Sequence, residues 1–467
     1  MIGRGELKGA KLLTQSRKAS WLIFWAIFLP TSLLAQTASS DPALIQQLFD
    51  RVNQLEMEVK ELRSKANTQK EIQPTPLLEP PASGENKDLA SDEQQAPVHE
   101  SKVGEAVPST ESAAQREMPL LHEHNQIPAP AGASFPYVRV RGFGDLGYTA
   151  VNTAAGTNGF GFGQLDIFAT AKLSSKLGVL VETVLEADQA TNQIGIDIER
   201  LLLQYRQSDF FNLDVGRYHQ SIGYYNTAYH HGRWFQTTVG RPFMFLFEDE
   251  GGLLPIHNVG VSASGRLPSG SLGLHYVFEA GNGRAYRTID ANPVQNSFDE
   301  NNGKSVNLAL FARPQSWPGW ELGGSVYRDR LTPLGQSPIR QYIYSGHAVY
   351  IKDRVEFLNE GIWMRHARQS DAGRQEIRSS VPAFYTQFAY RVAPSWRPYL
   401  RYEYMNAAAS DPIARPALGT SGWRQDMTVG VRFDAAEFMA IKFQLERIER
   451  RDLARTYRAM LNLSFTF

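Results

Sequence analysis

The chain contains 467 residues with 48 basic and 48 acidic side chains, and this zero net charge gives no sign of a nucleic-acid partner. The absence of cysteine excludes disulfides and thiolate metal sites, and it suits an exported protein. The 38 glycines, 19 tyrosines and 25 phenylalanines favour a β-sheet protein over a helical one.

The N-terminus has the order of features found in a secretory signal peptide. Basic residues within the first 18 positions precede an apolar run over residues 21–29 and the small residue Ala35. We therefore predict a signal peptide over residues 1–35, with cleavage near Ala35. The alternative is a single membrane anchor, but the apolar run is shorter than the roughly 20 residues that a bilayer span needs. Any further membrane contact must then use strands.

Residues 41–66 have the pattern of a short coiled coil. Apolar residues recur in alternating steps of three and four, with Asp41 able to cap the helix and Pro42 at its first position. An isolated helix of this length buries nothing, so the pattern predicts self-association. The alternative is an amphipathic helix that lies on another surface.

Residues 67–134 are predicted to form a disordered, Pro-rich linker in the periplasm. The segment is rich in Pro, Glu, Ser, Gln and Ala, and prolines interrupt every periodic pattern in it. Such a composition cannot bury enough apolar surface to fold alone.

From residue 137 to residue 467 the sequence predicts an all-β fold, a transmembrane antiparallel barrel of about sixteen strands. Segments of roughly 9 to 14 residues alternate apolar and polar side chains, the length and pattern of a tilted membrane strand. In the last segment Leu461 and Phe465 share one face, while Arg458 and Asn462 share the other. The strands of a soluble sandwich are usually shorter, around five or six residues.

The predicted connections alternate between tight turns and generally longer loops. Tight turns are expected on the periplasmic side and long loops on the extracellular side. An even number of strands places both ends of the barrel on one side.

These features resemble those of Gram-negative general and phosphate-selective porins. The resemblance rests on the signal peptide, the coiled coil, about sixteen strands and the terminal Phe467 on an alternating last strand. It implies an outer-membrane location and passive diffusion of small hydrophilic solutes or ions through a water-filled lumen. It also implies a homotrimer, and Phe467 resembles the signal that the barrel assembly machinery reads. Peptidoglycan is a further possible partner of the helix or linker.

The third external loop, residues 219–256, is the longest and is expected to fold into the lumen, as the resemblance implies. Its many aromatic residues favour inward packing over a solvated flap. Its acidic stretch, Glu248, Asp249 and Glu250 before a pair of glycines, is similar to that of general porins. Acidic and basic clusters that face each other across a lumen create a transverse field that selects solutes.

The basic partners predicted for this field lie in the loop, at its base and on inward strand positions. The alternative is that lumen arginines only pair with lumen carboxylates such as Asp166, Glu182, Glu403 and Glu446. The predicted basic constriction residues are Arg217, Arg233, Arg241, Arg401, Arg432, Lys442 and Arg458.

The sequence predicts neither an enzyme nor a cofactor or metal site. His230 and His231 are adjacent, so in an extended chain they point to opposite faces and do not easily share one ion. No G-x-S-x-G motif is present.

Two other functions stay open. One is a specific channel for phosphate or another anion, or for an oligosaccharide that stacks on aromatics such as Trp234. The other is a structural barrel whose N-terminal helix tethers the envelope.

Overall fold

The computed structural model describes residues 135–467 apart from short gaps. These gaps are residues 154, 155, 157, 189–191, 230, 231, 249, 251, 286–298, 300, 334–335, 371–374 and 415–421. The predicted signal peptide, coiled coil and linker lie outside the described residues. Among the described residues, no helix is both long and apolar enough to span a bilayer.

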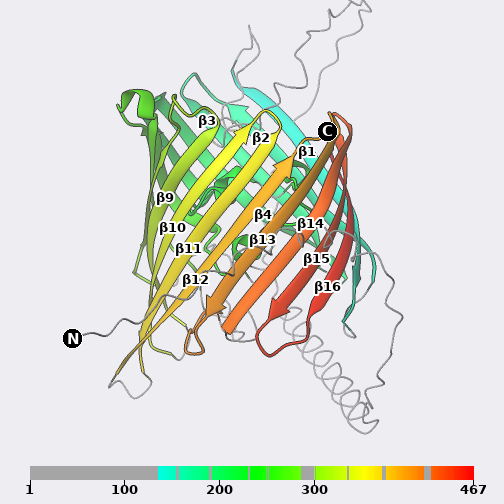
Figure 1. Ribbon diagram of the computed structural model, residues 1–467. Helices are drawn as coiled ribbons and strands as arrows, with labels where there is room; N and C mark the ends of the chain where they lie inside the picture. The colour runs from blue at the N-terminus through cyan, green and yellow to red at the C-terminus, as the bar shows by residue number, and fades with distance from the viewer. Residues whose placement is uncertain are drawn as a thin grey trace, which may run out of the picture. The chain divides into compact units, whose positions relative to one another are not determined.

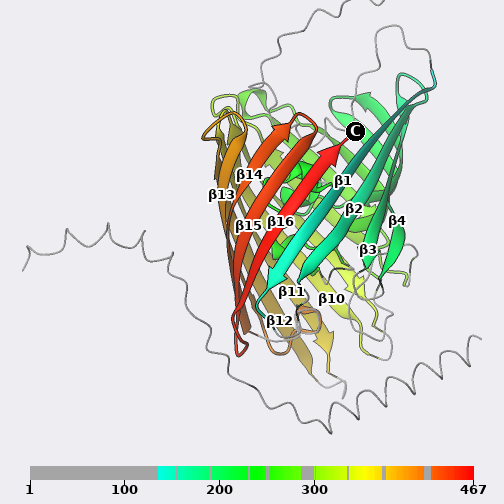
Figure 2. The same cartoon turned by 90° about the vertical axis from the view of Figure 1, so that its right-hand side faces the viewer.

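Sixteen antiparallel strands form one closed barrel (Figure 1), which confirms the predicted fold class for the described part of the chain. Each strand pairs with the next, and β1 pairs with β16 to close the sheet (Figure 2). The first eight strands are β1 (Tyr137–Val151), β2 (Gly159–Lys172), β3 (Leu177–Asp188), β4 (Gln193–Ser208), β5 (Phe211–His219), β6 (His257–Arg266), β7 (Leu274–Gly281) and β8 (Ser305–Ala312). The others are β9 (Trp320–Leu331), β10 (Ile339–Lys352), β11 (Val355–Gln369), β12 (Glu376–Tyr390), β13 (Trp396–Ala407), β14 (Gly422–Ala436), β15 (Met439–Arg450) and β16 (Thr456–Thr466).

The barrel is apolar outside and polar inside over much of its wall. On β15 the outward Phe443 and Leu445 are exposed, whereas the inward Lys442 and Gln444 are fully buried. A water-soluble protein shows the opposite arrangement, because its exposed face must be polar. This inversion is what a strand requires when lipid lies on one side and water or protein on the other.

The inner wall of β10 to β12 departs from the predicted polar pattern. Ile343, Leu358 and Val381 face inward and are fully buried, as is Met364. The reason is that the β5–β6 loop covers this part of the wall, and the two together form the largest apolar core.

The connections alternate in length as predicted. Residues 173–176, 209–210 and 353–354 are short links, while residues 220–256 and 282–304 are the longest ones on the opposite rim. Both ends of the barrel lie on the rim with the short turns, where the backbones of Gly142 and Phe467 exchange two hydrogen bonds.

The β5–β6 loop carries three short helical turns inside the barrel. They are α2 (Tyr225–Ala228), η2 (Arg233–Phe235) and η3 (Phe243–Phe245); η4 (Gly270–Leu272) belongs to the β6–β7 turn. In Figure 2 the green helical turns are seen behind the front strands.

Candidate constriction site

The β5–β6 loop folds into the lumen and touches several parts of its wall. Tyr225 and Phe245 stack at 5.7 Å, and both meet the ring of Tyr385 on β12 edge-on. On another part of the wall, Phe235 packs against Phe143 on β1 with ring centroids 4.7 Å apart. The aromatic residues that favour inward packing in the sequence therefore make the contacts that hold the loop inside.

Carboxylates on the wall accept hydrogen bonds from the backbone N–H groups of the loop. Glu360 on β11 accepts from the amides of both Tyr224 and Tyr225. Glu403 on β13 accepts from the amide of Phe243. Buried charged acceptors of this kind bind more strongly than neutral ones. Further contacts join Glu279 on β7 to the amide of Ser221, and Glu356 on β11 to the Thr237 hydroxyl.

Three predicted basic constriction residues on the barrel wall bind carbonyl oxygens of the β5–β6 loop. Arg401 on β13, Arg432 on β14 and Lys442 on β15 point inward as expected, but each is less than a tenth exposed. Their charges therefore hold the loop against the wall and are little exposed to the water of the lumen. The bonds run from Arg401 to Gly240 at 2.8 Å, from Arg432 to Trp234 at 2.7 Å and from Lys442 to Thr238 at 3.2 Å.

Arg241 is buried inside the loop. Its guanidinium donates to the carbonyl oxygens of Phe245 and Tyr229, at 2.6 and 3.0 Å, and lies 4.2 Å from the centre of the Phe247 ring. Burial lowers the pKa of Arg241, while the charges of Glu250 and Glu248 act in the opposite direction. The structure therefore brings Arg241 close to Glu248 and Glu250, and its hydrogen bonds stabilise the fold of the loop itself.

Glu248 is also buried, 2% exposed, and organises the end of the loop. Its carboxylate accepts from the amides of Ile256 and His257 at 2.6 and 3.1 Å. Burial by itself raises the pKa of Glu248, but the hydrogen bonds and charge of His257, together with Arg284, hold it below the ordinary value. Arg217, at the base of the loop, is buried as well and donates to the carbonyl oxygen of Glu199 at 3.0 Å.

The other predicted residues are more open. The side chain of Arg233 is 33% exposed and pairs with Asp145 on β1 at 3.2 Å. Arg458 is 37% exposed and pairs with Glu446 on β15. Glu250 is exposed, and Asp249 lies outside the described residues.

Pairing between lumen arginines and lumen carboxylates is widespread on the described wall. Glu182 pairs with Arg200, and Glu403 with Arg401 at 2.7 Å. Sequence reasoning did not single out Asp145, Glu356 or Glu360, although their inward positions were readable from the strand pattern. Which of these contacts each carboxylate makes depends on where the loop lies, and the pattern does not contain that information.

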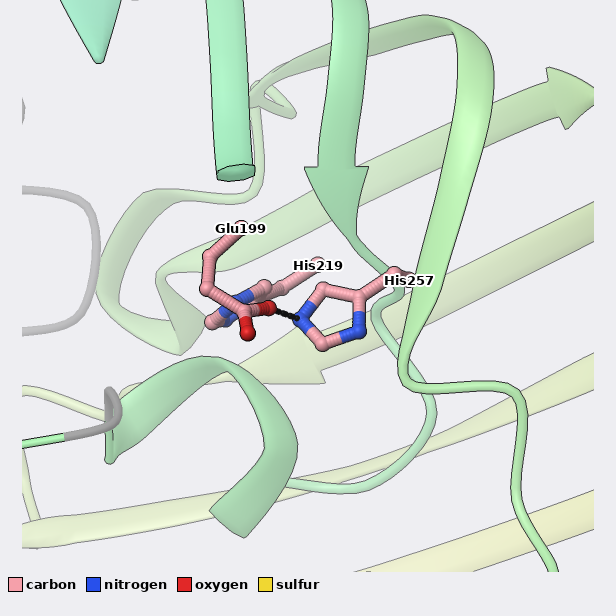
Figure 3. A group of neighbouring side chains, drawn as sticks. All are labelled: Glu199, His219 and His257. Atoms are coloured by element: carbon pink, nitrogen blue, oxygen red, sulfur yellow. Dashed lines mark ion pairs between the residues drawn. The ribbon is translucent and has the colours of Figure 1, made fainter. Parts of the chain in front are cut away.

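Within the part of the chain that the structure describes, one group of histidine and carboxylate side chains lies close enough together to hold a metal ion. Glu199, His219 and His257 place one ligand atom each within 4.8 Å of one another (Figure 3). The two adjacent histidines considered from the sequence, His230 and His231, lie outside the described residues.

A closed sixteen-stranded barrel with an apolar exterior and a loop held inside its lumen has the architecture of outer-membrane porins. No protein-family model matches the sequence, and the search of curated proteins found no match. Among solved structures, the fold is similar to the outer membrane channel DcaP of Acinetobacter baumannii, with a TM-score of 0.52 at 10% identity over 73% of this chain and 99% of that one. It is also similar to the anion-selective porin from Comamonas acidovorans, with a TM-score of 0.50 at 14% identity over 71% of this chain and 99% of that one. At these identities the similarity shows the fold.

Proposed function

We propose that the protein is an outer-membrane porin through which small hydrophilic solutes and ions diffuse passively, past a constriction made by residues 220–256. The observation that carries the proposal is the closed barrel with lipid-compatible side chains outside and a loop bound to its inner wall by buried charges. A barrel with this interior suits water and solutes, and its exterior suits lipid.

The direct test is conductance. Purified full-length protein, shown to be folded by its altered gel mobility without heating, should produce discrete conductance steps in planar lipid bilayers. Heat-denatured protein from the same preparation is the control. A folded sample that gives no steps would contradict the proposal.

Among the predicted constriction residues within the described ranges, we propose that the three that are not buried set the charge of the lumen. These are Arg233, Glu250 and Arg458. The buried ones, Arg217, Arg241, Glu248, Arg401, Arg432 and Lys442, would act through the position of the loop, because their charges are engaged with its backbone or its base.

A preference for anions is the second candidate, favoured by basic residues near the rim with the short turns. Arg139, Lys172, Lys176 and Arg206 line one depression there, although Arg206 also pairs with Asp214. In the β12–β13 turn, burial and the charges of Arg397, Arg432 and Arg354 lower the pKa of Arg391, with Asp434 opposing them. The porin from Comamonas acidovorans with the similar fold is itself anion-selective.

Reversal potentials under a salt gradient test this preference. We expect an anion-selective sign for the natural protein and a shift toward cations for the Arg139→Gln/Lys172→Gln double variant. Arg328→Gln is the matched control, because Arg328 is exposed on the outward face of β9. A cation-selective natural protein would contradict the anion preference and leave the porin proposal standing.

We further infer a homotrimer, inserted by the barrel assembly machinery through Phe467. Exposed aliphatic side chains such as Val138, Val140, Ile194 and Ile196 on β1 and β4 provide a surface that can pack against another protomer. Residues 1–35 are proposed as a signal peptide, residues 41–66 as a coiled coil and residues 67–134 as a linker.

Deleting residues 41–134 separates a pore from an envelope tether. A pore keeps its conductance without this segment, and a tether loses its envelope phenotype. Particle mass by light scattering in detergent, measured before and after the deletion, reports the oligomeric state and any contribution of the coiled coil to it.

A further inference from the structure

Two histidines and a carboxylate meet at the base of the β5–β6 loop. His219 is the last residue of β5 and His257 the first residue of β6, and the strand register pairs them directly. Glu199 comes from β4, the neighbour of β5. Figure 3 shows the three side chains turned toward one another.

A β-bulge brings Glu199 into this group. In the pairing of β3 with β4, Glu182 lies opposite Arg200 and Thr183 lies opposite Ile198, so Glu199 is the extra residue between them. Bulges of this kind re-aim a side chain, and here they allow the neighbouring residues Glu199 and Arg200 both to be buried on the inner side.

The geometry of the group is that of a partly assembled ligand set. Nε2 of His257 lies 2.6 Å from the Glu199 carboxylate, and the rings of His219 and His257 are 4.8 Å apart at 67°. Exposed fractions of 3% for Glu199, 8% for His219 and 1% for His257 show that the group is shielded from bulk water.

A second carboxylate orients one of the two rings. Oε2 of Glu248 lies 3.3 Å from Nδ1 of His257, on the opposite side of the ring from Glu199. Glu248 is itself held by the amide of Ile256. Histidines that bind metals commonly have such a carboxylate on their other ring nitrogen, which sets the orientation and raises the basicity of the ligand.

We propose that Glu199, His219 and His257 bind a divalent transition-metal ion with the chemistry of Zn²⁺, and that Glu248 is a positioning residue for His257. Two imidazoles and one carboxylate are ligands that Zn²⁺ accepts, and a single bound water would complete the tetrahedron. In tetrahedral zinc sites neighbouring ligand atoms are about 3.3 Å apart, so the contact between Glu199 and His257 lengthens by less than 1 Å on binding.

Such an ion would join the two ends of the loop. His219 precedes and His257 follows residues 220–256. One ion bound to both histidines would therefore crosslink the two ends of the loop that enters the lumen. This inference concerns a site separate from solute diffusion, and it does not depend on the porin proposal.

The test uses the full-length protein in detergent after chelator treatment. Zn²⁺ titration by calorimetry should show one more bound ion per chain in the natural protein than in His219→Ala. Zn²⁺ should also raise the thermal unfolding midpoint of the natural protein, because a ligand that binds only the folded state stabilises it. The matched control is His366→Ala, which removes another buried histidine with a carboxylate partner, Asp411.

Glu248→Gln separates positioning from stability. We expect Zn²⁺ affinity to fall about 10- to 100-fold while the barrel stays folded, since loss of such an outer carboxylate typically has that effect. Restoration of the affinity by Glu248→Asp would support positioning.

If the variants do not fold, X-ray absorption at the zinc edge of the natural protein still tests the proposal. The spectrum must show two imidazole ligands on the zinc. Equal zinc stoichiometry in the natural protein and folded His219→Ala would overturn the proposal, as would a zinc spectrum without imidazole ligands.

Discussion

Replacing Arg401 with methionine should release the β5–β6 loop from the wall of β13. The guanidinium of Arg401 donates to Glu403, to the Thr238 hydroxyl and to the carbonyl oxygens of Gly240 and Arg241, at 2.7, 3.0, 2.8 and 3.3 Å. Methionine fills much of the same volume but makes none of these bonds, and Glu403 is left buried without its cationic partner.

Removing one member of a buried ion pair costs about 3–5 kcal/mol. If that loss falls on the docking of the loop, the ratio of released to docked loops rises about 100- to 4,000-fold, because each 1.4 kcal/mol is a factor of ten. Released loops should appear as added current fluctuations in single-channel recordings. They should also appear as faster tryptic cleavage after Arg233, since cleavage follows the open population.

Two further variants test this reasoning. Arg401→Met/Glu403→Gln should recover much of the loss, because no unpaired charge remains. Arg458→Met is the matched control: its ion pair with Glu446 is more exposed and should contribute less than about 1 kcal/mol. The anchoring role of Arg401 is refuted if Arg401→Met leaves noise and cleavage unchanged, or if Arg458→Met changes both as strongly.

Three other predictions concern the loop, the wall and the terminus. Glu248→Gln should speed hydrogen exchange at the amide of Ile256, because a hydrogen bond to a charged acceptor, which stabilises by about 1.5–3 kcal/mol, is lost. Glu250→Gln is the control, because Glu250 is exposed, and it should leave this exchange unchanged. Since the pKa of Glu248 is held below 4.5, its stabilising contribution is present above that pH and is lost as the pH falls below it. The protection factor of the Ile256 amide, which is the observed exchange rate corrected for the slower intrinsic exchange in acid, should therefore fall on acidification. A protection factor that stays constant would contradict this. Gly216→Ala should lower the yield of folded barrel, because φ is +134° there and a Cβ would collide with the Leu201 carbonyl oxygen. The control Gly159→Ala should fold normally, because nothing lies within 4 Å of its Cβ. Equal amounts of the heat-modifiable gel band for the two variants would argue against strain at Gly216. Deletion of Phe467 should reduce the folded barrel in the outer-membrane fraction while Phe443→Ala does not, and unchanged levels would remove its role as an assembly signal.

The strands could be predicted because the alternation of side chains is a local property. Phe443, Lys442 and Gln444 reveal an outward and an inward face without knowledge of any other strand. The bulge at Glu199 was not predictable in this way, because the extra residue becomes apparent only in the pairing of β4 with β3.

The roles of the basic residues needed tertiary information. The strand pattern places Arg401 and Lys442 inside the barrel, but their partners are loop carbonyls more than 150 positions away in sequence. The same applies to His219 and His257. A usable signal was nevertheless present, because histidines at the two ends of the longest loop must become neighbours when the flanking strands pair.

The pairing between β1 and β16 determines when the barrel can close during folding. These two strands come from opposite ends of the barrel sequence. The outer edge of β1 can therefore pair only after β16, the last strand of eleven residues, is present. Before β1 pairs with β16, the open sheet has two edge strands, and their unpaired N–H and C=O groups can pair with any other extended chain. A product truncated before Thr456 lacks β16, so both edges of its sheet stay unpaired, and we expect it to aggregate more readily than the full-length chain.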